Sequence, residues 1–239
     1  MMKAIKLNHI NKNFKSKQAL KDVNIEFHSN KINGLLGPNG SGKTTLFNII
    51  TGFLSPNEGQ ILLDDKDLTS LSLSYRSKLG ISYLPQEASI FRDMSVYDNI
   101  HSIAELFHSK KVSIEVTNDL IKKFSLQNFQ NTKGKLLSGG ERRRAEIARA
   151  LASNPKFLLL DEPFAGIDPI AIEEVKSTIS LLKKLSIGII ITDHNVKEAL
   201  SIVDFGYIIY NGQIIKSGSP KEIISDNFVK KIYLGKNYQ

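Results

Sequence analysis

The sequence predicts an α/β fold with a mainly parallel sheet, an antiparallel β start and an α-helical insert. Three observations support this prediction. Short strand-like runs alternate with helix-like segments, a glycine-rich turn joins one such run directly to a helix, and helical spacing of apolar residues governs the middle of the chain. No internal repeat or interdomain linker is visible, so residues 1–239 are expected to form a single domain.

Strands dominate the beginning of the chain. The pattern of apolar residues and turn residues predicts strands at residues 4–8, 23–27, 31–36, 60–63 and 81–84. One helix is predicted in this part, at residues 43–51, directly after the glycine-rich turn.

From Ser95 onward the apolar residues follow helical spacing. Two helical faces are predicted, one with Val96, Ile100, Ile103, Ala104 and Phe107, and another with Ile114, Leu120, Ile121 and Phe124. We therefore expect a helical subdomain at about residues 87–154, inserted into a core made of about residues 1–86 and 155–239.

Helices and strands alternate again towards the end of the chain. The predicted elements are helices at residues 139–152, 169–185 and 195–201, strands at residues 157–160 and 187–192, and a hairpin of residues 206–210 and 213–216. The hairpin should turn at Asn211 and Gly212, a dipeptide that favours tight β-turns.

Composition narrows the class of protein. The 41% apolar content is enough for a sizeable core, and the chain has no cysteine and no export leader, which favours the cytoplasm. The apolar runs fall far short of the roughly 20 residues that cross a bilayer, so a membrane role would need a partner. The net charge of +8 comes from scattered lysine pairs without an aromatic stripe, which favours a solvated surface over attraction to an anionic cytoplasmic leaflet or to phosphates, nucleic acid included.

The glycine-rich turn carries phosphate-binding chemistry. The segment from Gly37 to Thr44 fits the P-loop pattern G-x-x-x-x-G-K-[ST], with a predicted strand before it and a helix after it. Backbone N–H groups of such a loop converge on phosphate oxygens, Lys43 should reach the β- and γ-phosphates, and Thr44 should bind Mg²⁺. The expected nucleotide-binding residues of this segment are Gly37, Pro38, Asn39, Gly40, Ser41, Gly42, Lys43, Thr44 and Thr45.

Two carboxylates follow the strand predicted at residues 157–160. In a P-loop protein, a carboxylate at the end of this strand lies beside the metal, so Asp161 is assigned to Mg²⁺, usually through water. Glu162 is then the candidate that orients and polarises the attacking water. The alternative, an ordinary strand end before a turn at Pro163, is disfavoured by the neighbouring P-loop.

A second pair of glycines opens the helix predicted at residues 139–152. Ser138 is suited to be the N-cap of this helix. The same helix N-terminus, with Gly139 and Gly140, is also a second anion site, which a partner subunit could present to the γ-phosphate at Lys43. Both interpretations stay open from these residues alone.

The chain resembles an ATP-binding-cassette ATPase. The P-loop, the segment from Leu137 to Glu141, the pair Asp161-Glu162 and a histidine after the next strand occur in the order of that family, over roughly residues 4–219. The resemblance implies ATP and Mg²⁺ as cofactors and a head-to-tail homodimer with two ATP molecules. Each ATP would lie between the P-loop of one chain and four residues of the other, namely Ser138, Gly139, Gly140 and Glu141.

Four further residues receive roles from the resemblance. It implies that Phe14 stacks on adenine, that Gln86 senses Mg²⁺ and the γ-phosphate, that His194 contacts the γ-phosphate, and that Asp168 belongs to a loop across the dimer interface. The implied catalytic residues are Lys43, Gln86, Glu162 and His194, and the implied metal ligands are Thr44, Gln86 and Asp161. A core aromatic, a loop amide, a structural histidine and a helix N-cap are the ordinary alternatives.

Within the family, residues 83–99 resemble the ATPase subunits of bacterial lipopolysaccharide exporters, as do residues 137–144, 161–169, 191–196 and 229–235. This resemblance implies two transmembrane subunits as partners, a place on the cytoplasmic face of the inner membrane, and no contact with the cargo. Phe91 and Arg92 are the candidates for the groove that receives the membrane subunits, with core packing and a solvated charge as alternatives.

The expected function is ATP hydrolysis that powers extraction and export of lipopolysaccharide from the inner membrane. One alternative is the ATPase of a branched-chain or polar amino-acid importer, which the run at residues 89–99 disfavours. Another is a soluble, non-transport protein of the same family, which usually has two cassettes or a long coiled insertion, neither of which is visible in this sequence.

Overall fold

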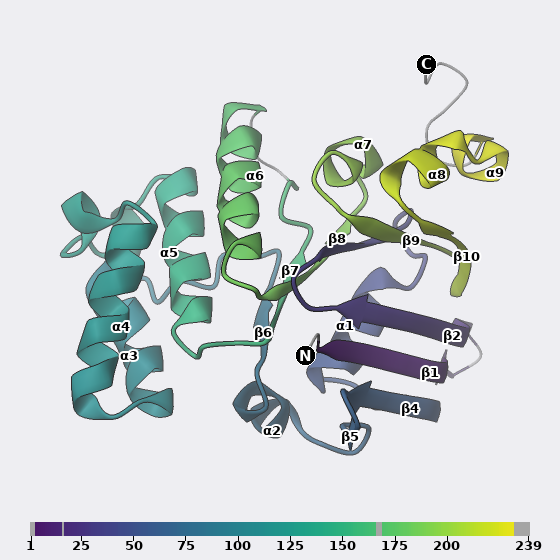
Figure 1. The fold of residues 1–239 in the computed structure, drawn as a ribbon, viewed down its shortest axis with the longest axis horizontal. Coiled ribbons are helices and arrows are strands. Elements are labelled where there is room, and N and C mark those ends of the chain that lie inside the picture. The colour runs from purple at the N-terminus through teal and green to yellow at the C-terminus, as the bar shows by residue number, and fades with distance from the viewer. Residues whose placement is uncertain (1–2, 16, 166–168, 232–239) are drawn as a thin grey trace.

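A computed structural model describes residues 3–15, 17–165 and 169–231 (Figure 1). The beginning of the chain supplies an antiparallel sheet in the order β2-β1-β4-β5. Its strands are β1 (Ala4–Phe14), β2 (Lys17–His28), β4 (Glu58–Leu63) and β5 (Lys66–Asp67). The predicted antiparallel β start is confirmed.

The second sheet positions the functional residues. Its order is β10-β9-β3-β8-β7-β6, and every neighbouring pair is parallel except β9 with β10. The strands are β3 (Ile32–Leu36), β6 (Ile81–Leu84), β7 (Phe157–Asp161), β8 (Gly188–Asp193), β9 (Phe205–Tyr210) and β10 (Gln213–Gly218). Because parallel strands end at the same edge, the segments that follow β3, β7 and β8 are brought together there.

Some helices flank the sheets, and others form a separate group at one side. The α-helices are α1 (Lys43–Thr51), α2 (Leu73–Lys78), α3 (Val96–Phe107), α4 (Lys110–Lys123), α5 (Gly139–Leu151), α6 (Pro169–Lys183), α7 (Val196–Leu200), α8 (Pro220–Ser225) and α9 (Asn227–Val229). Two 3₁₀ turns, Gln127–Phe129 and Gly134–Leu136, join α4 to α5. Figure 1 shows α3, α4 and α5 together, beside the sheets.

The six-stranded sheet separates two hydrophobic cores. Side chains alternate along β7, so Leu158 and Leu160 face one core whereas Phe157 and Leu159 face the other. The first core continues into α3 and α4, where Ile100 and Leu120 are buried. The helical insert and the sheet therefore share one continuous hydrophobic core.

The helix α4 corrects one sequence prediction. The spacing predicts that Ile114 shares a helix face with Leu120, but the Ile114 side chain is 40% exposed whereas Leu120 is buried. The buried stripe instead includes Ser113 and Thr117, whose hydroxyls donate to the carbonyl groups of Lys110 and Ser113. Hydrogen bonds within the helix thus satisfy polar side chains that the apolar pattern alone excludes from the core.

A buried arginine fixes the end of the P-loop helix. Arg76 of α2 is 1% exposed, and its Nη1 donates to the carbonyl groups of Ile49 and Ile50 at 2.5 and 2.9 Å. Its Nε donates to the carbonyl group of Leu71 at 2.8 Å. The two bonds to Ile49 and Ile50 satisfy carbonyls in the last turn of α1, which have no partner within the helix.

Candidate nucleotide-binding site

The P-loop runs from β3 into α1 in a conformation that requires glycine. Gly42 has a φ of +113°, which L side chains rarely adopt. At Gly37 an added Cβ would lie 2.5 Å from the carbonyl oxygen of Ile209. The turn at Gly212 supports the loop, because its N–H donates to the carbonyl group of Ser41 at 2.9 Å. The sequence pattern thus reflects close packing of the loop on the β9–β10 hairpin.

Lys43 lies against the loop that it belongs to. Its Nζ donates to the carbonyl groups of Gly37 at 2.6 Å and Pro38 at 3.2 Å, and it lies 4.0 Å from Oε1 of Glu162. The side chain is 5% exposed, and burial lowers the pKa of Lys43 below its usual value, although the nearby carboxylates act in the opposite direction. A phosphate at this position would offer a stronger partner than the two carbonyl oxygens.

A pocket of about 740 Å³ gathers nine of the predicted residues, with Asp161 and His194 outside its lining. Of those predicted, it is lined by Phe14, Asn39, Gly40, Gly42, Lys43, Thr44, Thr45, Gln86 and Glu162. Gly37, Pro38 and Ser41 are outside this lining, and the hydroxyl of Ser41 is buried without a hydrogen-bond partner among the described residues. A buried, unpaired hydroxyl within the loop fits a site that is completed by a phosphate oxygen.

Asp161 is held from two sides at the end of β7. Thr192 Oγ1 donates to its Oδ1 at 2.5 Å, and the Tyr83 hydroxyl donates to its Oδ2 at 3.2 Å. Burial and the Asp161 carboxylate raise the pKa of Tyr83, so Tyr83 keeps its proton as a donor. Both carboxylate oxygens are engaged, which fits the expectation that Asp161 reaches a metal through water.

The oxygen donors in the pocket suit Mg²⁺. Thr44 and Gln86 line the pocket with a hydroxyl and an amide, and Asp161 is fixed at the neighbouring strand end. Hydroxyl, amide and carboxylate oxygens are the ligand type that Mg²⁺ prefers. The residues present therefore fit the ion that the sequence predicts.

Glu162 and His194 meet where β7 and β8 end. His194 Nδ1 lies 3.0 Å from Oε2 of Glu162. The backbone of Glu162 has a φ of +43°, and its N–H points to the carbonyl and hydroxyl oxygens of Thr192 at 3.0 and 3.1 Å. This strained turn presents the carboxylate to the pocket that Lys43 also lines.

Asp193 stabilises the loop that follows Glu162. Its carboxylate accepts hydrogen bonds from the N–H groups of Asn195 at 2.7 Å and Phe164 at 3.3 Å. The residue is fully buried, and this burial raises the pKa of Asp193. Asp193 thereby connects the chain after Glu162 to the chain after His194.

The structure does not bring residues 138–141 to this pocket. Ser138 is the N-cap of α5, and Glu141 completes a capping box, since Glu141 Oε2 accepts from the Ser138 N–H at 2.8 Å. Neither residue lines the nucleotide pocket of the same chain. Asp168, the predicted dimer-loop residue, lies outside the described residues.

One wall of the pocket was not predicted from the sequence. It is formed by Lys17, Gln18, Ala19 and Lys21 of β2, together with Asn211 and Gly212 of the hairpin turn. Asn211 and Gly212 both have positive φ, as a type I′ turn requires. The turn itself was predicted, but its approach to the P-loop depends on sheet topology that local patterns do not encode.

A separate apolar groove of about 710 Å³ lies beside α3 and α5. Phe91, 45% exposed, lines it, and the guanidinium of Arg149 lies 4.7 Å from the centre of the Phe91 ring. The groove is bordered by exposed apolar side chains, Phe53 and Leu106 among them. Arg92, predicted with Phe91, is exposed but does not line this groove.

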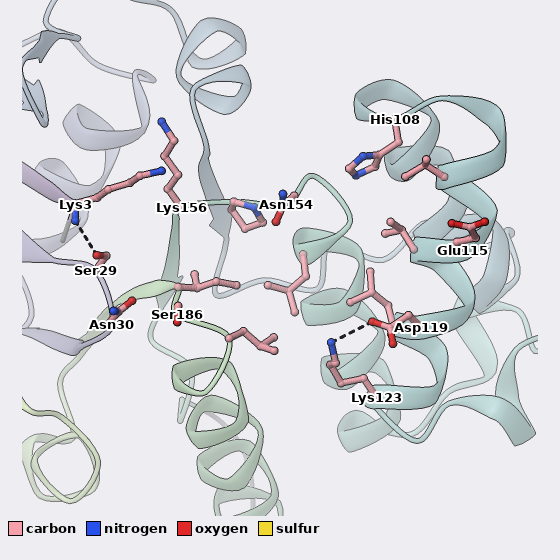
Figure 2. A pocket seen from close by; sticks show the side chains of 17 residues that line it. Lys3, Ser29, Asn30, His108, Glu115, Asp119, Lys123, Asn154, Lys156 and Ser186 are labelled. Carbon is pink, nitrogen blue, oxygen red and sulfur yellow. Dashed lines mark hydrogen bonds and ion pairs between the residues drawn. The ribbon is translucent and has the colours of Figure 1, made fainter. Parts of the chain in front are cut away.

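A further cleft shares no lining residue with the nucleotide pocket (Figure 2). It has a volume of about 1010 Å³ and lies where β7 and β8 begin, whereas the P-loop follows the end of β3. Figure 2 shows Lys3 and Lys156 on one side of this cleft and Glu115 and Asp119 of α4 on the other. Because β3, β7 and β8 are parallel, the cleft lies at the opposite edge of the sheet from the P-loop.

Comparisons with known families and sequences agree with this geometry. A family model described as ABC transporter matches residues 20–165. The chain is 43% identical to the lipopolysaccharide export system ATP-binding protein LptB of Haemophilus influenzae and 44% identical to the protein of that name from Escherichia coli K12. Both matches extend over 240 aligned residues and cover all of each chain.

Solved structures have the same fold. The ADP conformation of MJ1267, an ATP-binding cassette of an ABC transporter, matches with a TM-score of 0.88 and 31% identity, covering 99% of this chain and 100% of that one. CbiO1 of Clostridium perfringens, part of the ABC transporter complex cbiONQ, matches with a TM-score of 0.85 and 28% identity, covering 97% and 95%. Among the described residues, no helix combines the length and apolarity that a membrane span requires.

Proposed function

This chain belongs to the ABC transporter family as an ATPase subunit, and we propose that it powers extraction and export of lipopolysaccharide from the inner membrane. The observation that carries the proposal is the pocket in which Lys43, Gln86 and Glu162 converge. Identity of 43–44% over the whole chain to lipopolysaccharide export ATP-binding proteins supports lipopolysaccharide as the cargo.

In the proposed reaction, Lys43 leaves the carbonyl groups of Gly37 and Pro38 and binds the β- and γ-phosphates of ATP. Phe14, at the mouth of the pocket and 43% exposed, stacks on adenine. Thr44, Gln86 and, through water, Asp161 would hold Mg²⁺, which would supply positive charge to offset the negative charge of the phosphates.

Glu162 carries the central role in hydrolysis. Its carboxylate orients a water molecule and polarises its O–H bond, so that the water oxygen attacks the γ-phosphorus while the bond to ADP breaks. His194 holds the carboxylate by its 3.0 Å contact and itself reaches the γ-phosphate. Gln86 contacts the γ-phosphate, and this contact shifts the segment that follows Gln86.

The active unit is proposed to be a head-to-tail homodimer. Residues 138–141 do not line the chain's own pocket, and the N-terminus of α5, where Gly139 and Gly140 follow the Ser138 cap, suits an anion. A second copy would bring its Ser138, Gly139 and Gly140 to the γ-phosphate, with Glu141 keeping the capping box. Asp168 is proposed to cross the interface between the two copies.

The membrane partners are proposed to be two transmembrane subunits that insert into the groove at Phe91. The exposed apolar side chains around this groove would be covered by such a partner. Arg92, beside the groove, would contact the rim. The chain itself would stay in the cytoplasm, on the inner face of the membrane, without touching the cargo or nucleic acid.

A division into two moving parts completes the proposal. We assign about residues 87–154 to a helical subdomain and about residues 1–86 and 155–239 to the core. ATP closes the dimer, the helical subdomain rotates towards the core, and the groove moves the membrane subunits.

Affinity purification with Glu162→Gln tests the proposed function. With ATP and Mg²⁺ present, this variant should hold a closed dimer and co-purify two transmembrane subunits of a lipopolysaccharide exporter from detergent-solubilised membranes. Amino-acid permease subunits or ribosomes in their place would overturn the cargo assignment.

A further inference from the structure

One face of α5 holds the segment that contains Gln86. Arg143, Glu146 and Arg149 follow one another at three-residue spacing, which places them on the same side of the helix. Arg143 Nη1 donates to the carbonyl group of Pro85 at 3.3 Å, directly before Gln86. Glu146 contacts Ser89 and Ile90, which follow Gln86. The helix α5 therefore binds this segment on both sides of Gln86.

Glu146 makes the shortest of its hydrogen bonds to the backbone of this segment. Its Oε1 accepts from the N–H of Ser89 at 2.7 Å and from the N–H of Ile90 at 3.1 Å. Its Oε2 lies 3.4 Å from Arg143 Nη1. The residue is 2% exposed, so the two backbone donors and the arginine are what stabilise its charge.

The carboxylate lies between two parts of the nucleotide machinery. The helix α5 begins with Gly139 and is capped by Ser138, which we have assigned to the partner's nucleotide. Gln86 lines the chain's own pocket. Charge-assisted hydrogen bonds to backbone N–H groups are strong and directional, so a displacement of α5 is passed to the Gln86 segment.

We propose that Glu146 is a positioning residue for ATP hydrolysis. It binds the Gln86 segment to α5, so that engagement of residues 138–140 by the partner's nucleotide places Gln86 correctly at the chain's own nucleotide. The inference rests on the proposed function, and it adds a residue that touches neither nucleotide.

Glu146→Gln is the first variant to test, because it keeps the size of the side chain. The amide oxygen accepts from the Ser89 and Ile90 N–H groups without charge, and the amide N–H₂ faces the Arg143 guanidinium, donor against donor. We expect kcat for ATP to fall about tenfold while KM for ATP changes less than about threefold, because Lys43 and the P-loop are untouched. Glu115→Gln, an exposed carboxylate on α4, is the matched control and keeps both constants.

The combination with Gln86→Ala separates positioning from a general effect on the fold. If Glu146 acts through Gln86, adding Glu146→Gln to Gln86→Ala lowers kcat no further. Losses that multiply, or an unchanged kcat in Glu146→Gln alone, overturn the inference.

Circular dichroism checks that each variant is folded. If Glu146→Gln does not fold, Glu146→Asp replaces it in the same cycle, with the same expectations, because it keeps the charge and shortens the reach by one methylene. A wild-type chain without ATP turnover overturns the proposed function and this inference with it, whereas an active wild type with multiplying losses overturns the inference alone.

Discussion

His194 Nδ1 lies 3.0 Å from Oε2 of Glu162, where two parallel strands end side by side. The contact joins residues 32 positions apart in sequence, and the pairing of β7 with β8 is what brings them together. Glu162 is thereby held between a histidine on one side and Lys43, 4.0 Å from its Oε1, on the other. A carboxylate fixed in this way is suited to orient a single water molecule.

His194→Ala should remove this support. We expect kcat for ATP to fall about 10- to 100-fold with ATP affinity nearly unchanged, because the P-loop contacts remain. Steady-state turnover and equilibrium binding of a fluorescent ATP analogue measure the two effects separately. His9→Ala, which removes an exposed histidine paired with Asp22, serves as the control. Wild-type turnover in His194→Ala would show that the contact has no role in hydrolysis.

Burial of Lys43 should destabilise the nucleotide-free protein by an amount that depends on pH. Burial lowers its pKa in the folded chain, so between the lowered value and the unfolded value of 10.5 the unfolded chain binds more protons, and stability rises with pH. Lys43→Met should therefore raise the melting temperature of the nucleotide-free protein at pH 7, and this gain should shrink as the pH approaches 10.5.

Thermal unfolding of the wild type and of Lys43→Met across this pH range measures the difference. ATP should stabilise the wild type but not the variant, because the variant lacks the ammonium group that meets the phosphates. If the gain in melting temperature is the same at every pH, it does not come from the lowered pKa of Lys43.

Thr192→Val should weaken the metal site. The substitution keeps the shape but leaves Oδ1 of Asp161 without its donor, which should cost about 1–3 kcal/mol of stability. We also expect a higher Mg²⁺ concentration for half-maximal turnover, because Asp161 loses its fixed orientation. Thr51→Val is the matched control, since Thr51 is equally buried but donates to the carbonyl groups of Phe47 and Asn48. Equal Mg²⁺ dependence in both variants would argue against the role of Thr192.

Phe91→Ala should separate ATP hydrolysis from partner binding. The ring lines the apolar groove and lies next to Arg149, away from the nucleotide pocket. We expect near-wild-type turnover by the isolated chain but loss of co-purifying transmembrane subunits, because a buried aromatic anchor contributes about 2 kcal/mol or more to binding. Phe228→Ala, at an aromatic side chain that is 51% exposed near the end of the described chain, should keep both properties. If Phe91→Ala still co-purifies the transmembrane subunits, the groove at Phe91 is not the surface that binds them.

The local signals in the sequence predicted much of the fold. The helix at residues 43–51 and the strand at residues 81–84 have the predicted bounds, because glycine or proline marks their ends. Strand β1 runs to Phe14 instead of ending at residue 8, since register shifts and a positive φ at His9 let it continue through polar residues. The short elements β5, α2, α8 and α9 were missed for lack of a long apolar pattern.

Long-range contacts were beyond the reach of the sequence. Tyr83 and Asp161 are 78 positions apart, and Glu146 and Ser89 are 57 apart. No local pattern distinguishes Tyr83 from an ordinary strand aromatic, or Glu146 from a solvated helix carboxylate. Only the pairing of β6 with β7 and the packing of α5 against the Gln86 segment reveal these roles.

ATP turnover by the full chain, compared with Glu162→Gln under identical conditions, tests the central claim most directly. We predict that the variant binds ATP and Mg²⁺ as the wild type does, forms an ATP-dependent dimer, and hydrolyses ATP at least about 100-fold more slowly. Turnover by Glu162→Gln at the wild-type rate would contradict the assignment of Glu162 as the residue that activates water.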